Sequence, residues 1–442
     1  MGDLMDNPIM QLVAGSTAGV VLTLATYTCL TSLFGNRAAV LVGCFVVVFL
    51  VESIFRVRQY SDKSIDLQIM LKIVSWCYIF LFAVLRIPKY IGALTSAPRI
   101  FWMILFAWAL YSATYSLNPS YSAVAILSVI AFFLYFISLE TETDDVTILL
   151  TVSSAIAAIA FVSLIVYFAV PQLGRMSEWQ GGAYVVGHRL SGIVGTPNAM
   201  GETAALGLVL LAMKWREMEQ RLNPTILSLF CLVCGVALIM SYSRTSIFSV
   251  LAILGANRVM RTRYLPWIIF LAIGALVCVL VLVPYSEQVM IALSRSGDAS
   301  EIETGTARTQ IWDTVSKLAE MKFWAGWGYA SSVFLLPNYA AYMGEAPPHA
   351  HNIVLQLWLT VGMIGVIAFV IALLAQALYA AWHRDALSLA LLGFVIINGA
   401  MEPGAFAGIA NMATVALAMA AARGSRRNAP VQFAYPLRTA AA

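Results

Sequence analysis

Long apolar blocks separated by shorter polar connections are the main pattern of this chain. Residues 38–55 contain a single charge, Glu52, and residues 265–283 contain none. About 20 helical residues, rising about 1.5 Å each, cross the hydrocarbon core of a bilayer, which is roughly 30 Å thick. Only a helix satisfies its own backbone polar groups over such a run in lipid. The pattern therefore predicts an all-α integral membrane protein.

The apolar blocks predict 12 or 13 transmembrane helices, and no internal repeat divides them, so we expect residues 1–442 to form a single polytopic membrane domain. The candidate spans are residues 11–34, 38–55, 69–85, 100–117, 121–139, 146–170, 199–213, 224–240, 245–256, 265–283, 352–381, 386–401 and 405–422.

Composition excludes several classes of protein. Hydrophobic residues make up 61% of the chain and charged residues only 11%, against about 25% in an ordinary soluble domain. There are too few charges to cover a soluble surface. The net charge of +4, with no long basic tract, gives no indication of nucleic-acid binding. Cys231 and Cys234 form a C-x-x-C inside a predicted span, where packing is the simpler interpretation than a redox or zinc site.

Two connections, residues 171–198 and 284–350, are longer than the rest. Within the second, Ile311, Val315 and Leu318 follow helical spacing, which predicts a short amphipathic helix over residues 306–321, near the membrane surface. The start of the chain lacks the basic segment of a cleavable signal peptide, so we expect the first span to remain as an anchor.

Short loops that are rich in lysine and arginine tend to lie on the cytoplasmic side of the membrane, which indicates the orientation of the chain. The basic clusters at residues 214–221, 258–263 and 423–427 can all lie in the cytoplasm. Both long connections then lie on the opposite side, which makes residues 284–350 a large periplasmic loop. Arg56, Arg58 and Lys63 would also fall outside, against the rule, so the topology of the N-terminal third stays open.

This orientation gathers unusual polar residues at one membrane face. A charge held beside the membrane is costly and is a functional hypothesis by default. Each residue also has a structural explanation, such as an arginine that snorkels to lipid headgroups. The residues are His351 and Asn352 at one helix start, Arg244 at another, His188 and Arg189 in the first long connection, and Arg308 in the second.

We predict neither a metal nor a cofactor. His349 and His351 are poorly spaced as ligands on a helix, and the nearby acidic residues, Asp298, Glu301 and Glu303, add no recognisable ligand pattern. Gly326 and Gly328 indicate a tight turn rather than a phosphate-binding loop.

Ordered motifs give the chain a family resemblance over residues 189–365. From His351 the sequence reads H-N, nine residues, Gly362, two residues, Gly365. Before it come RLSGIVGTPNAMGE, then SYSRTS at a helix start, an arginine and a tryptophan four residues apart (Arg308 and Trp312), and GWGY. This set resembles the O-antigen ligase family and its relatives, which include O-antigen and exopolysaccharide polymerases and bacterial protein O-oligosaccharyltransferases.

The resemblance implies a GT-C-like membrane fold and metal-independent, inverting transfer of a glycan from undecaprenyl pyrophosphate at the periplasmic face of the bacterial inner membrane. Arginine binds phosphate oxygens in a bidentate fork, so the expected diphosphate ligands are Arg189, Arg244 and Arg308. Histidine suits a general base near neutral pH, which favours His351. Supporting candidates are Asn352, which could orient the base or cap its helix, His349 and His188.

The first-choice function is an O-antigen ligase that transfers a polysaccharide to the lipid A–core oligosaccharide. A polymerase that extends a growing glycan would use the same chemistry, and a protein glycosyltransferase is the third reading. The number of spans also suggests a secondary transporter. Against a transporter, the halves show no hydropathy repeat and no paired charge in mid-span.

Overall fold

A computed structural model describes residues 38–54, 67–180, 183–260, 308–343 and 347–423 of the chain. The predicted spans at residues 11–34 and 265–283 lie outside the described residues, as do residues 284–307 and 344–346 of the predicted loop at 284–350.

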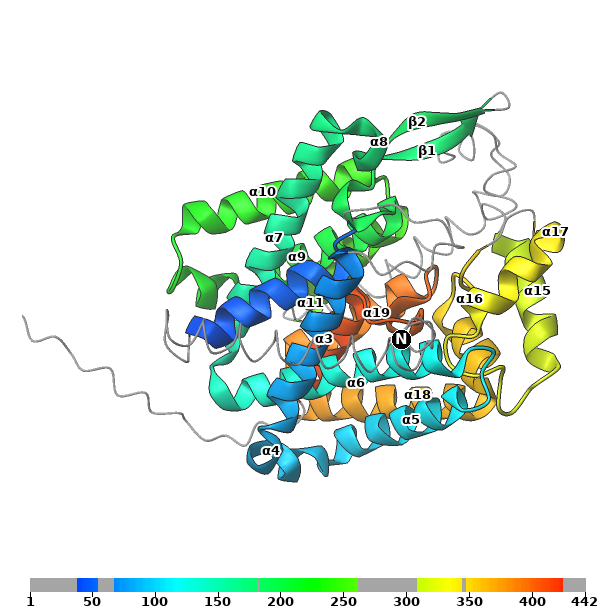
Figure 1. Cartoon of the computed structure of the whole chain (residues 1–442). Helices are drawn as coiled ribbons and strands as arrows, with labels where there is room; N and C mark the ends of the chain where they lie inside the picture. Colours follow the sequence, from blue (N-terminus) through cyan, green and yellow to red (C-terminus); the bar gives the residue numbers. More distant parts are fainter. Residues whose placement is uncertain (1–37, 55–66, 181–182, 261–307, 344–346, 424–442) are drawn as a thin grey trace, which may run out of the picture.

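The described residues are helical apart from one hairpin (Figure 1). After a first helix, Ala38–Glu52, the α-helices are α3 (Leu67–Val84), α4 (Ile87–Leu94), α5 (Ala97–Ala113), α6 (Pro119–Glu142), α7 (Asp145–Ala169), α8 (Pro171–Gly174), α9 (Pro197–Glu219), α10 (Pro224–Ser241), α11 (Arg244–Met260), α15 (Arg308–Glu320), α16 (Ser332–Leu335), α17 (Ala340–Met343), α18 (Ile353–Trp382), α19 (Ala386–Gly399) and α20 (Met412–Ala422). Short 3₁₀ turns are η1 (Gly192–Val194), η3 (Leu336–Tyr339) and η4 (Gly404–Phe406), and the strands are β1 (Arg175–Gln180) and β2 (Ala183–Leu190).

Five described helices are long and apolar enough to cross a membrane: α3, α6, α7, α10 and α18. A sixth span results if α4 and α5, bent by 99° at their junction, are counted together. The all-α, membrane-spanning character predicted from the apolar blocks is therefore confirmed, while the number of 12 spans stays a prediction.

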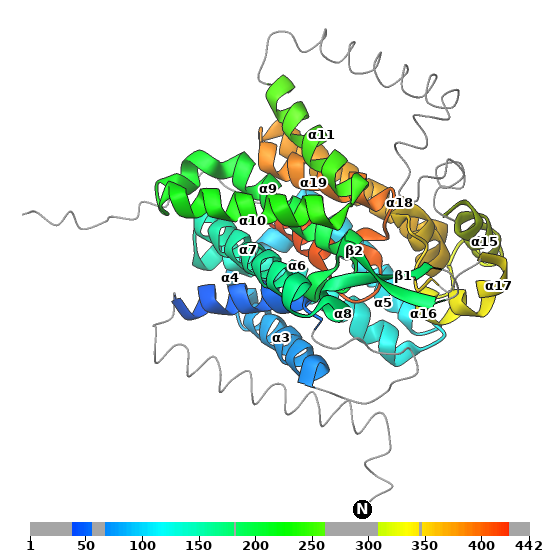
Figure 2. The ribbon, with the colours of Figure 1, turned by 90° about the horizontal axis from the view of Figure 1, so that it is seen from above.

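The helices pack in two neighbouring groups around α20. Helices α5, α6 and α18 lie side by side (Figure 1), and α7, α9 and α10 form the second group (Figure 2). All of α20 is buried, and it packs against α6 and α19. The predicted continuous span at 405–422 is wrong, because a 3₁₀ turn precedes α20, whose start is fixed by a capping box from Asn411.

The first long connection contains the antiparallel hairpin β1–β2, which the sequence did not predict. Side chains alternate across a strand, and on β2 the Arg189 side chain is buried while that of His188 is exposed. The hairpin leads through η1 to Thr196, whose hydroxyl accepts the Ala199 N–H and caps α9.

The amphipathic helix predicted at 306–321 is present as α15. Ile311, Val315 and Leu318 are buried in a small core with Leu336 and Leu359. The apolar face of α15 therefore packs on the protein and is not available to lipid.

A break in α18 allows the segment that follows α15 to hydrogen-bond to α18. Gly362 has φ +71°, and a Cβ there would lie 2.1 Å from the Trp324 carbonyl oxygen, so only glycine fits. The freed Leu359 and Thr360 carbonyls accept hydrogen bonds from the Trp327 and Gly328 N–H groups. This pairing holds α15 beside the start of α18, where the candidate residues lie.

Candidate functional site

The predicted residues meet where the starts of α9, α15 and α18 face the turn after α19. The hairpin and α15–α17 lie together on the same side of the molecule (right-hand side of Figure 1). Segments separated by up to 204 residues are hydrogen-bonded here, as between Asn198 and Glu402.

Glu402, in the turn after α19, joins the cluster. Its Oε1 accepts hydrogen bonds from Arg308 Nη2 at 2.9 Å and from Asn198 Nδ2 at 2.7 Å. Its Oε2 lies 3.1 Å from His351 Nδ1. The carboxylate is 16% exposed, so a ligand or solvent can still reach this small cluster.

Arg189 is attached to the same cluster through an amide. Its Nη2 donates to Asn198 Oδ1 at 3.0 Å, and its Nε donates to the Ser241 carbonyl at 3.2 Å. The chain of contacts therefore runs from Arg189 through Asn198 to Glu402, and from there to Arg308 and His351. The structure thus brings together the predicted base and two of the three predicted diphosphate ligands.

Burial alone would raise the pKa of the Glu402 carboxyl, but the hydrogen bond from His351 and the neighbouring basic groups, which include Arg308, hold that pKa below its usual value. Glu402 is therefore ionised at neutral pH, and an ionised carboxylate can only accept hydrogen bonds. In the hydrogen bond between His351 and Glu402, the proton is therefore on His351 Nδ1. The lone pair of the neutral ring is then on Nε2.

A strained turn directs the His351 ring. His351 has φ +49°, a left-handed conformation that is uncommon for a residue with a side chain. Asn352 stabilises the turn, because its Oδ1 accepts the Val354 and Leu355 N–H groups and its Nδ2 donates to the Ala400 carbonyl. Asn352 therefore caps α18 and also ties it to the segment that carries Glu402.

Trp312 holds α15 against the same turn. Its indole N–H donates to the carbonyl of Ala350, the residue before His351, at 3.0 Å. Since Arg308 lies one helical turn before Trp312 on α15, this bond keeps its guanidinium beside Glu402.

His349 lies against the base. Its ring meets that of His351 edge-on with centroids 4.3 Å apart. Burial, followed by repulsion from His351, lowers the pKa of His349 to about 4, so this ring is neutral at pH 7. Its buried Nδ1 has no hydrogen-bond partner among the described residues.

Two predicted residues border this cluster. Arg244 begins α11, and its side chain is exposed. The segment around it is held close by Ser241, whose carbonyl accepts from Arg189, and by Ser246, which donates to Asn398 of α19. The exposed ring of His188 packs edge-on against Tyr242 at 5.2 Å.

Sequence reasoning missed Glu402 and Asn198. One signal was available for Glu402: it follows the predicted span 386–401, whose end lies on the same face as His351 in the predicted orientation. Asn198 follows Pro197 at the start of a helix, where an asparagine carries no particular signal of function.

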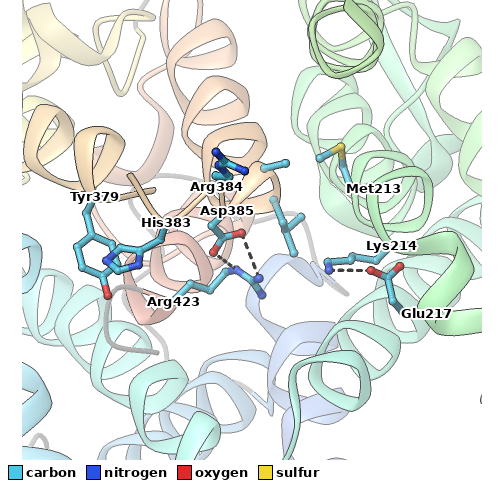
Figure 3. Close-up of a pocket in the computed structure, with 10 residues that line it drawn as sticks. Met213, Lys214, Glu217, Tyr379, His383, Arg384, Asp385 and Arg423 are labelled. Atoms are coloured by element: carbon cyan, nitrogen blue, oxygen red, sulfur yellow. Dashed lines mark hydrogen bonds and ion pairs between the residues drawn. The ribbon is translucent and has the colours of Figure 1, made fainter. Parts of the chain in front are cut away.

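A second polar cluster lies at the other ends of α9 and α18, around a cavity of about 350 Å³ (Figure 3). Arg423 Nε donates to Asp385 Oδ2 at 2.8 Å, and its Nη1 is hydrogen-bonded to Asp145. Lys214 is paired with Glu217 at 2.9 Å. Burial opposes the charge of Arg423, but the two carboxylates raise its pKa overall.

Comparison with protein families confirms the resemblance. Residues 229–370 match the model of the O-antigen ligase family, so the chain is similar to that family over this segment. A search of curated proteins found no match. Arg244, Arg308, His349, His351 and Asn352 lie within the matched segment, whereas Arg189, Asn198 and Glu402 lie outside it. The family and the apolar helices together indicate a multi-pass membrane protein with O-antigen ligase or polymerase-type activity on a lipid-linked glycan.

Proposed function

We propose that this protein is an O-antigen ligase, which transfers a glycan from undecaprenyl pyrophosphate to the lipid A–core oligosaccharide at the periplasmic face of the inner membrane. The observation that carries the proposal is a single carboxylate, Glu402, bonded to both the candidate base His351 and the candidate phosphate ligand Arg308. The family match supports transfer chemistry of this type.

The arginines of the cluster suit it to a diphosphate. Arg308 pairs with Glu402, Arg189 is linked to Glu402 through Asn198, and Arg244 begins a helix at the same end. A diphosphate group offers the acceptor oxygens for bidentate hydrogen bonds to guanidinium groups. Arginine remains charged throughout, so the leaving group needs no divalent cation.

In the proposed reaction the acceptor hydroxyl attacks C1 of the donor sugar. His351 Nε2 takes the hydroxyl proton while the new C1–O bond forms. The bond from C1 to the diphosphate oxygen breaks, and its electron pair leaves with undecaprenyl pyrophosphate. The guanidinium groups stabilise the charge that develops on the departing oxygen. A single displacement of this kind inverts the anomeric centre.

Glu402 acts as a positioning residue for both partners. Its Oε2 keeps the proton of the neutral His351 ring on Nδ1, so Nε2 can accept a proton. The positive charge that the ring gains during transfer is stabilised by the same carboxylate. Through Oε1 it also fixes Arg308 and, by way of Asn198, Arg189.

The test is a strain that lacks this chain, with its lipopolysaccharide analysed on a gel. A ligase predicts bare core on the surface and full-length glycan retained on the lipid carrier. Single repeat units attached to the core would instead identify a polymerase. Unchanged lipopolysaccharide and no accumulated lipid-linked glycan would refute the proposal.

A further inference from the structure

Three possible metal ligands converge beside the proposed base. Nitrogens of His349 and His351 and a carboxylate oxygen of Glu402 all lie within 4.8 Å of one another. The left-handed turn at His351 produces this arrangement, since it folds the two rings together at 4.3 Å between centroids. The spacing argument from the sequence considered only a helix and could not foresee it.

An orphaned nitrogen provides a second, independent observation. His349 Nδ1 is buried and has no hydrogen-bond partner among the described residues. A buried polar atom without a partner costs free energy, and a ring with an unpartnered nitrogen beside two other possible ligands is suited to a metal ion. An imidazole nitrogen that carries no proton has the lone pair that metal binding needs.

Two imidazoles and one carboxylate form a donor set that suits Zn²⁺ and related transition metals. Ligands that each lie about 2.0–2.2 Å from a zinc ion are roughly 3.5 Å apart in tetrahedral geometry. The three ligand atoms, which lie within 4.8 Å of one another, would approach by up to about 1.3 Å to reach that separation. Arg308, bonded to the other oxygen of Glu402, opposes a cation, so we expect moderate affinity.

We propose that His349, His351 and Glu402 bind a divalent transition-metal ion of the Zn²⁺ class, and that the bound ion inhibits glycan transfer. The ion would replace the proton between His351 Nδ1 and Glu402. The neutral ring would then carry its proton on Nε2, where no lone pair remains to accept the proton of the acceptor hydroxyl. Inhibition rests on the proposed function, whereas binding does not.

Binding is tested by titrating Zn²⁺ into the full-length protein in detergent by calorimetry, with an affinity tag that contains no histidine. The chain has four histidines, and His383, in the opposite cluster, provides the matched control. The wild type should bind one Zn²⁺, and His349→Ala should weaken binding by at least about tenfold. His383→Ala should leave the affinity unchanged.

His349→Gln, which keeps a polar group at this position, is a second variant in case the alanine change disturbs folding. No binding at millimolar Zn²⁺, or equal affinity in the wild type and both His349 variants, would overturn the proposed site.

Inhibition is tested separately in a transfer assay, with and without a chelator. Transfer that Zn²⁺ slows and the chelator restores supports the proposed block at His351. If the protein binds zinc and transfer is undiminished, the proposed inhibition is wrong. If the protein binds zinc but transfers no glycan even without it, the proposed function is wrong and the metal site stands.

Discussion

The two ends of α9 and α18 carry polar clusters in which the arginines are paired differently. One cluster surrounds Glu402, whose carboxylate contacts Arg308 and the His351 ring directly and is linked to Arg189 through Asn198. In the other, around the cavity of Figure 3, Arg423 is paired with Asp385. The Arg423 guanidinium also pairs with the Asp145 carboxylate.

The difference separates a structural ion-pair network from a binding site. A cation already enclosed by two carboxylates gains little from an anionic ligand, and breaking its contacts costs stability. Arg308, which pairs with one carboxylate that also contacts the His351 ring, can still attract an anion. The number of carboxylates that surround an arginine therefore distinguishes the two roles.

The largest difference between the clusters should come from their histidines. His351→Ala removes the proposed base, so transfer by the purified protein should fall by about 10²–10⁴-fold. His383→Ala, in the opposite cluster, should leave the rate unchanged. Equal rates for the two variants, at equal protein levels, would remove the assignment of His351.

Glu402→Gln should have the next largest effect. The amide keeps the shape of the side chain but loses the charge that holds the His351 tautomer and Arg308. A charged hydrogen bond contributes about 1.5–3 kcal/mol, so the transfer rate should fall roughly 10–100-fold. A rate within twofold of the wild type would show that the carboxylate does not position the base.

A smaller loss is expected when the guanidinium of Arg308 becomes an ammonium. Arg308→Lys keeps the charge but loses the bidentate fork, so the KM for the lipid-linked donor should rise roughly tenfold. Lys317→Arg is the matched control, since Lys317 lies on the same helix and its side chain is 71% exposed. Full activity of Arg308→Lys would refute bidentate binding at this position.

Asp385→Asn in the opposite cluster should affect stability and not transfer. The change removes one of the two carboxylates that neutralise the nearly buried Arg423, at a cost of about 1–3 kcal/mol. The melting temperature in detergent should fall while the kcat stays at the wild-type value. A large fall in kcat without a change in melting temperature would contradict the structural role.

The smallest effect is expected at Asp144, which caps α7 and pairs with Arg221. Burial opposes its charge, but hydrogen bonds from Thr147 and Arg221 lower the pKa of Asp144 overall from 3.8. The resulting stability is present above pH 3.8 and is lost as the pH falls through the lower pKa of the folded state.

Asp144→Ala should therefore cost about 1 kcal/mol at neutral pH and less in acid. Melting curves at neutral and acidic pH would check this. An equal loss of stability at neutral and acidic pH would contradict the stabilising role of the ionised Asp144 carboxylate.

Local sequence patterns predicted most of the helices and part of the candidate site. Ten of the predicted spans coincide with described helices to within a few residues, because apolar runs and capping residues act locally. His351, Arg308 and Arg189 were identified because charge beside a membrane is rare.

Glu402 and the turn at His351 required three-dimensional information. Glu402 and His351 are 51 residues apart in the sequence. Their contact depends on how α18 and α19 pack. His349 lies close to His351 because His351 has a positive φ. The sequence does not indicate this conformation, since no glycine stands at that position. The hairpin likewise lies in a segment without clear alternation of apolar and polar residues.

The central claim is that Glu402 acts on the reaction through His351, and a double-mutant cycle tests it most directly. The kcat at saturating donor would be measured for His351→Ala, Glu402→Gln and the double variant. If the carboxylate works mainly through the imidazole, the double variant should be much faster than the product of the two single losses predicts, and any further loss relative to His351→Ala should reflect the Arg308 contact. If the two losses multiply in the double variant, the residues act independently and the claim is wrong.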